Sequence, residues 1–133
     1  MAVAHADAQL AESARSAATE IAAKAAASSA SLKFEGHWGF QYYMEQQGAI
    51  ALDSKNLRLS PRDVIVVPLG NSYLFPLPGQ IVEPWFAHDV PWSSWISTMD
   101  GTLGAGYYSD GWGPLPFVLG QVPPDKYLVY RVR

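Results

Sequence analysis

The chain contains no cysteine, which excludes a disulfide framework, a thiolate metal site and a cysteine nucleophile. It also lacks any apolar run near the ~20 residues that a membrane-spanning helix needs, so no membrane partner is expected. Basic residues are few, since 9 Lys and Arg stand against 12 Asp and Glu for a formal net charge of −3. Because no stripe of Lys and Arg is present to neutralise phosphates, nucleic acid is not expected as a partner either.

The first part of the chain also lacks aromatic residues, glycine and proline. All five Phe, five Trp and seven Tyr follow Lys33, as do all 11 Gly and all 10 Pro. This break predicts two parts, an Ala-rich helical arm with its linker (1–33) and a compact β domain (34–133). The second part is long enough for one modest core, to which a partner subunit would add buried surface.

The alanine-rich part is predicted to form a helix from about Asp7 to Ser28, because alanine has the highest helix propensity and nothing there breaks a helix. Glu20 and Lys24 add a favourable i,i+4 pair. One stripe of this helix carries few large side chains, and each buried methylene is worth only ~0.8 kcal/mol, so the stripe is weak on its own.

This helix has two possible interpretations. In the first it is a surface helix or a partly disordered tail, and in the second it is a thin coiled coil or a helix that docks on another protein. We favour the second, because an isolated helix of this length is marginal without tertiary contacts. The expected oligomer or docking interface consists of Leu10, Ala14, Ala17, Ile21 and Leu32.

The body is predicted to be mainly β, an antiparallel sandwich or a partly closed barrel of about eight short strands. The stretch FEGHWGFQYYME alternates between apolar and polar residues and predicts the clearest strand. AIAL and LRL flank a turn at Asp53–Asn56 and predict a hairpin, and VIVV predicts a buried strand. EPWFAHDVPWSSW is expected to be irregular, and KYLVYRVR to be the last strand.

Catalytic chemistry has little support in the sequence. His37 and His88 belong to no HxH or HxxxH pair, so neither a metal nor a cofactor is expected. No GxSxG elbow occurs. Paired carboxylates for glycoside hydrolysis stay possible in principle, and their separation is a matter of structure; the candidates are Glu35, Glu45, Glu83, Asp89 and Asp110. The chain is therefore not expected to be an enzyme, with a small cupin-type or glycosidase-type enzyme as the third alternative.

Aromatic residues in two predicted loops are better candidates for binding. Exposed Trp and Tyr next to Asp or Ser suit sugar rings, whose C–H faces stack on π systems, and the same residues are enriched at protein interfaces. The alternative is that these rings fill the core of a small domain. The candidate ligand-binding residues are Trp92, Tyr107, Tyr108, Asp110 and Trp112.

The segment from Ala11 to Ser31 resembles the Ala/Ser-rich helical spacers of tailed-phage fibre proteins, and the whole arrangement is similar to head-fibre and capsid decoration proteins. The resemblance is compositional and covers about a sixth of the chain, while residues 34–133 match no motif. It implies a virion structural protein, assembled in the host cytoplasm, whose partners are copies of itself in a homotrimer and other virion proteins. The alternative function is a carbohydrate-binding module that recognises a host glycan.

Overall fold

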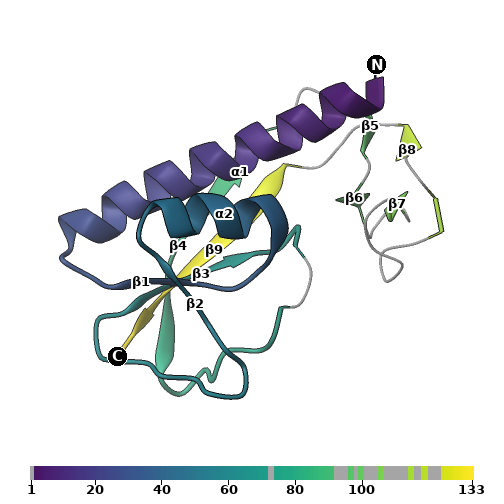
Figure 1. Cartoon of the computed structure of the whole chain (residues 1–133). Coiled ribbons are helices and arrows are strands. Elements are labelled where there is room, and N and C mark those ends of the chain that lie inside the picture. The colour runs from purple at the N-terminus through teal and green to yellow at the C-terminus, as the bar shows by residue number, and fades with distance from the viewer. Residues whose placement is uncertain are drawn as a thin grey trace.

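The computed structural model describes residues 2–71, 74–91, 96–97, 99–100, 105–106, 114–115, 118–119 and 124–133. Its two helices and nine strands follow one another along the chain as Figure 1 shows. In order, they are α1 (Ala2–Ala27), β1 (Leu32–Phe34), α2 (Trp38–Gln46), β2 (Ile50–Ala51), β3 (Val64–Pro68), β4 (Val82–Val90), β5 (Ile96–Ser97), β6 (Met99–Asp100), β7 (Ala105–Gly106), β8 (Val118–Leu119) and β9 (Asp125–Val132).

The main sheet has five strands in the order β2-β1-β3-β9-β4. β1 runs parallel to both β2 and β3, whereas β9 runs antiparallel to both β3 and β4. Two separate pairs, β5 with β8 and β6 with β7, complete the described strands. The expectation of an N-terminal helix ahead of a sheet is therefore confirmed, but the described residues form an open mixed sheet and not the expected antiparallel sandwich or barrel.

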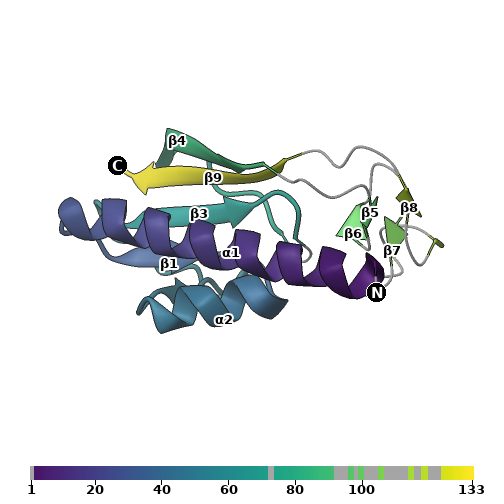
Figure 2. The same cartoon turned by 90° about the horizontal axis from the view of Figure 1, so that it is seen from above.

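α1 and α2 pack against one face of the sheet, and Figures 1 and 2 show the long α1 lying beside both α2 and the strands. The inward face of α1 carries mostly small side chains. Ala17 and Ala18 are fully buried on this face, together with the larger Ile21. The helix ends where Ser29 adopts a left-handed conformation (φ 54°) and the Ala30 N–H donates to the Ala25 carbonyl. The predicted end at Ser28 is therefore correct to within a residue.

β3 is the centre of the sheet and is buried along its whole length, as an apolar strand flanked by two others should be. Val64 and Val66 face the helices, and Ile65 and Val67 face the opposite side. That opposite side is covered by the segment between β2 and β4, which contributes Leu52, Leu59, Leu74 and Leu77. The predictions of a buried VIVV strand and of a terminal strand, now β9, are confirmed.

The stretch predicted as the clearest strand is mostly helix. β1 ends at Phe34, the chain turns through Gly36 (φ 100°), and α2 begins at Trp38. Phe40 and Met44 then repeat at a spacing of four and are 3% and 0% exposed. The apparent period of two was wrong because the aromatic residues that suggested it include Trp38 and Tyr42, which lie on the exposed side of the helix.

Two further predictions of local structure were wrong. The predicted hairpin at Asp53–Asn56 does not form, because β2 pairs in parallel with β1 and residues 57–59 are not a strand. The segment expected to be irregular contains β4, an edge strand that pairs with β9 along nearly its whole length. Its pairing slips between Pro84 and Phe86, which is how an edge strand accommodates a proline.

Candidate ligand-binding site

The residues predicted as an oligomer interface lie inside the chain's own core. Ala14, Ala17, Ile21 and Leu32 are at most 8% exposed and belong to the cluster that joins α1 to α2 and the sheet. Leu10 is half-buried and lines a pocket. The chain's own body therefore supplies the apolar surface on which this stripe packs, and an oligomer or docking interface on this helix stays a prediction.

The residues predicted to bind a ligand lie outside the described part of the chain. They are Trp92, Tyr107, Tyr108, Asp110 and Trp112. The structure instead shows a pocket elsewhere, of about 240 Å³. We call it the α1–α2 pocket; it is lined by Asp7, Leu10, Ala11, Ala14, Trp38, Gly39, Phe40, Pro68, Gly70, Asn71, Asp125 and Tyr127.

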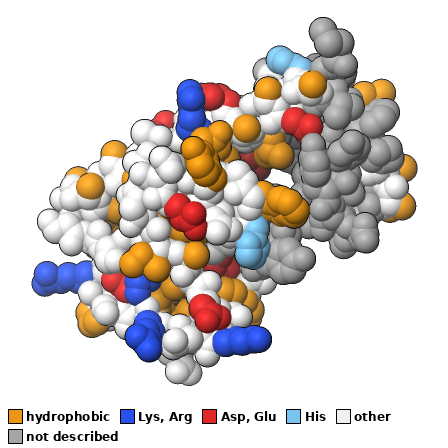
Figure 3. Space-filling view, in the orientation of Figure 1, with side chains coloured by type: hydrophobic (Ala, Val, Ile, Leu, Met, Phe, Trp, Pro, Cys, Tyr) orange, Lys and Arg blue, Asp and Glu red, His pale blue; other side chains and the backbone are white. Residues whose placement is uncertain are grey.

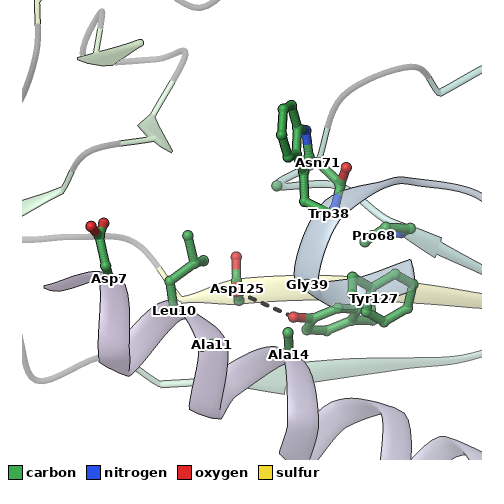
Figure 4. Close-up of a pocket in the computed structure, with 12 residues that line it drawn as sticks. Asp7, Leu10, Ala11, Ala14, Trp38, Gly39, Pro68, Asn71, Asp125 and Tyr127 are labelled. Carbon is green, nitrogen blue, oxygen red and sulfur yellow. Dashed lines mark hydrogen bonds between the residues drawn. The ribbon is translucent and has the colours of Figure 1, made fainter. Parts of the chain in front are cut away.

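The pocket lies between the N-terminal half of α1, the first turn of α2 and the adjoining ends of β3 and β9. Figure 4 shows Leu10 and Asp125 pointing from one wall toward the side on which Trp38 and Asn71 lie. The lining is largely apolar, with a few polar groups at defined places, which is the usual make-up of a small-molecule site.

The wall at the start of α2 is held in an unusual backbone conformation. Gly36 has φ 100° and Trp38 has φ 63°, so two residues of this short turn are left-handed. The Asn71 side chain fixes the residue between them, because its Oδ1 accepts the His37 N–H and its Nδ2 donates to the His37 carbonyl, both at 3.0 Å. The turn presents the Trp38 side chain to solvent at 60% exposure.

A carboxyl group lies on the opposite wall. Asp125 Oδ2 accepts a hydrogen bond from Ser13 Oγ at 2.8 Å and another from Tyr127 OH at 3.2 Å. Burial raises the pKa of Asp125 above its ordinary value, and the two hydroxyl donors only partly oppose this effect. Burial and the neighbouring Asp125 charge also raise the pKa of Tyr127, so this phenol stays protonated and remains a donor.

The charge of the pocket has one sign. Its described lining residues include Asp7 and Asp125 but no Lys, Arg or His. In Figure 3 the Lys and Arg side chains of the visible face gather mainly toward the end of the sheet where the chain terminates, away from the N-terminus of α1. An anionic ligand would therefore meet carboxylates without any lining cation to offset them.

A second hollow, of about 510 Å³, is lined by His37, Leu52, Asp53, Ser54, Leu74 and Phe75. Near it Glu35 is 2% exposed, and its Oε2 accepts the Phe75 N–H at 3.1 Å. Burial raises the pKa of Glu35, and the Phe75 hydrogen bond partly opposes the rise. Its Oε1 has no hydrogen-bond partner within the described residues, and neither oxygen belongs to the lining of the hollow.

Metal and membrane sites find no support in the described ranges. No three His, Asp or Glu side chains converge there as a metal ion would need. His88 lies 3.7 Å from Glu20 of α1, which makes it a contact between helix and sheet. In the same part of the chain, neither helix combines the length and apolar character that crossing a bilayer requires.

Comparison with known proteins found no matching family model, no matching curated protein and no matching solved structure. The assignment of the site therefore depends on its geometry. Sequence reasoning missed Trp38, Asn71 and Asp125 as site residues. The sequence signal for Trp38 was GHWG, in which the tryptophan is flanked by two nearby glycines. Glycine readily adopts the backbone conformations of tight turns, so this motif indicates a turn that carries an aromatic side chain.

Proposed function

We propose that this chain is a carbohydrate-binding module and that its binding site is the α1–α2 pocket. Trp38 is the stacking platform, and Asp125 is the polar group that receives a sugar hydroxyl. The proposal keeps the chemistry expected for the loop residues Trp92 and Trp112 but assigns it to a different part of the chain.

The single observation that carries the proposal is the strained display of Trp38. A residue other than glycine in the left-handed region costs about 1–2 kcal/mol, and Trp38 is held there while most of its side chain remains in water. Strain of this kind persists where the surrounding structure enforces it and clusters at ligand sites.

The shape and chemistry of the pocket fit one sugar ring. Its volume of about 240 Å³ lies just below the ~300–1,000 Å³ typical of drug-sized sites. The C–H face of a pyranose can stack on the Trp38 indole, as apolar groups do on aromatic faces. Ring hydroxyls can donate to the Asp125 carboxylate and accept from, or donate to, the polar groups of the rim.

The prediction of a virion structural subunit stays untested, and so do its homotrimer, its virion partners and its location in the virion. The virion prediction was based partly on the apolar stripe of the Ala-rich helix, which was expected to be buried against another chain. Because Ala17, Ala18 and Ile21 pack within the chain itself, the packing of α1 does not add to that motivation. We therefore place the binding role first.

The test is a titration of the chain with methyl glycosides of glucose, galactose, mannose and glucosamine, followed by NMR. Trp38→Ala should weaken binding by about tenfold or more, since stacking contributes on the order of 1–3 kcal/mol in aromatic sites. Tyr42→Ala is the matched control, because Tyr42 is 59% exposed on the same helix and does not line the pocket. Absence of binding to every glycoside, or equal binding by Trp38→Ala, would contradict the proposal.

A further inference from the structure

Asp125 is a half-buried carboxyl group that has no cationic partner among the described residues. Both groups that donate to it, Ser13 Oγ and Tyr127 OH, are neutral hydroxyls. Among the described residues no Lys, Arg or His forms an ion pair with it, although other acidic residues, such as Asp63 with Lys33, do find cations. Buried carboxylates are normally paired with a positive charge, so a positive charge is what this site lacks.

We propose that the ligand supplies this charge: the sugar bound in the α1–α2 pocket is an amino sugar with a free, protonated amine, which contacts Asp125 Oδ1. This inference rests on the proposed function and narrows it to one ligand class. The amine forms a charge-assisted hydrogen bond, which is roughly twice as strong as a neutral one.

The geometry of the carboxyl group supports this role. Its Oδ2 already receives two hydroxyl donors, which fix the orientation of the group. Its Oδ1 makes no hydrogen bond to the described residues. In Figure 4 the Asp125 side chain points away from β9 toward the side of the pocket where Trp38 and Asn71 lie. The open oxygen is therefore available to a ligand in the pocket.

Gly70 makes this placement of Asp125 possible. A Cβ added at position 70 would lie 2.7 Å from Asp125 Oδ1, closer than such atoms approach one another. Any side chain at this position would push the open oxygen aside or cover it. The end of β3 thus leaves room for the carboxyl group at the point where a ligand would reach it.

The remaining lining favours a cation over an anion. Asp7 supplies a second carboxyl group, and Trp38, Phe40 and Tyr127 supply aromatic rings. Aromatic faces attract ammonium groups electrostatically. A sugar acid or a sugar phosphate would instead face two carboxyl groups and no cation among the described lining residues. A neutral sugar would supply no positive charge to Asp125.

The test compares methyl β-glucosaminide, methyl β-glucoside and methyl β-glucuronide as ligands of the full chain at neutral pH. We expect the glucosaminide to bind about tenfold more tightly than the glucoside, since a hydrogen bond to a charged group adds on the order of 1.5 kcal/mol. The glucuronide should bind most weakly. Equal affinity for the glucosaminide and the glucoside would overturn the inference and leave the proposed function standing, whereas no binding of any sugar would overturn both.

Variants locate the effect within the pocket. Asp125→Asn keeps one acceptor for Ser13 and Tyr127 and should abolish the preference for the glucosaminide, so that the glucosaminide and the glucoside bind with similar, reduced affinity. Asp89→Asn is the control, because Asp89 is an exposed carboxyl group of β4 outside the pocket. Retention of the full glucosaminide preference in Asp125→Asn would overturn the inference. If Asp125→Asn does not fold, the comparison of the three ligands on the unmodified chain decides the matter.

Discussion

Asn71 holds the main chain of His37 at two points, accepting its N–H and donating to its carbonyl, each at 3.0 Å. A side-chain amide thus pairs with a backbone residue as a neighbouring strand would. The contact joins the end of β3 to the turn that leads from β1 into α2. It fixes the residue immediately before Trp38, so the strained display of the indole depends on it.

Replacement of Asn71 should therefore affect both stability and binding. Asn71→Ala removes both hydrogen bonds and should lower the free energy of unfolding by about 1–2 kcal/mol, since each net bond is worth about 1 kcal/mol. Asn71→Asp keeps the acceptor for the His37 N–H but places a carboxylate oxygen against the His37 carbonyl oxygen, so its loss should be at least as large as that of Asn71→Ala. Urea unfolding measures both variants, and unchanged stability in either one would show that the two-point contact does not hold the turn.

Trp38 allows a direct measurement of backbone strain. Its left-handed conformation (φ 63°) suits glycine and penalises any residue with a Cβ. Trp38→Gly should therefore be more stable than Trp38→Ala by about 1 kcal/mol, although glycine is ordinarily the poorer helix residue. Both variants should lose the stacking platform. Thermal or urea unfolding of the pair tests this, and a less stable glycine variant would mean that the turn is not strained at this residue.

Gly36 and Gly48 form a second matched pair. Both have positive φ, 100° and 77°, but a Cβ at Gly36 would lie 2.8 Å from Pro68 Cγ, whereas one at Gly48 would meet nothing within 4 Å. Gly48→Ala should cost only the conformational penalty of about 1–2 kcal/mol. Gly36→Ala should cost clearly more and should also displace Asn71, whose Cγ lies 3.2 Å from the added atom. Equal costs would mean that the neighbourhood of Gly36 yields freely.

Glu35 should give stability a distinctive pH dependence. Because burial raises its pKa above the ordinary 4.5, the folded chain holds this proton more tightly than the unfolded chain does. Its contribution is therefore fully present below the unfolded pKa and is lost as the pH rises through the folded pKa. Asp125 contributes with the same sign.

Glu35→Gln removes this dependence. The variant should be more stable than the parent chain at neutral pH, and the difference should shrink as the pH is lowered toward about 4. Glu45→Gln, on the exposed side of α2, serves as the control. A series of urea midpoints between about pH 4 and 8 measures the effect, and a difference that grows on acidification would contradict the assignment.

The position of α1 in the core leads to a further prediction. Ala18 is fully buried and Ala26 is exposed on the same helix. Ala18→Leu inserts a larger side chain into a filled space and should cost about 1–3 kcal/mol, while Ala26→Leu should be nearly neutral. Equal effects on urea unfolding would mean that α1 does not pack on its own sheet as described.

The sequence predicts that α1 is a helix, but it does not predict what α1 packs against. Propensity alone placed the helix and its end near Ser28, because a run of alanine without glycine or proline allows little else. Propensity could not identify its partner. The small side chains of Ala17 and Ala18, taken as a weak seam, allow close approach to α2 and the sheet, and this packing depends on contacts between residues far apart in the chain.

The candidate site was hidden for a related reason. GHWGFQYYME has apolar residues that fit a period of two at first and a spacing of four from Phe40 onward, so the sequence alone favours a strand where the structure has α2. Asp125 is distant in sequence from Ser13 and lies near it only in the folded chain. A buried strand such as VIVV can be predicted because a run of apolar residues is itself the signal for burial. A pocket cannot be predicted in this way, because it is formed by segments that are far apart in the sequence.

The measurement that tests the central claim most directly is an NMR titration of the isotope-labelled chain with methyl β-glucosaminide. The account predicts that the Trp38 indole N–H and the backbone amides of Leu10, Gly70 and Asp125 shift together with one binding constant. Shifts confined to residues outside the α1–α2 pocket, with the Trp38 indole N–H unmoved at saturation, would contradict it.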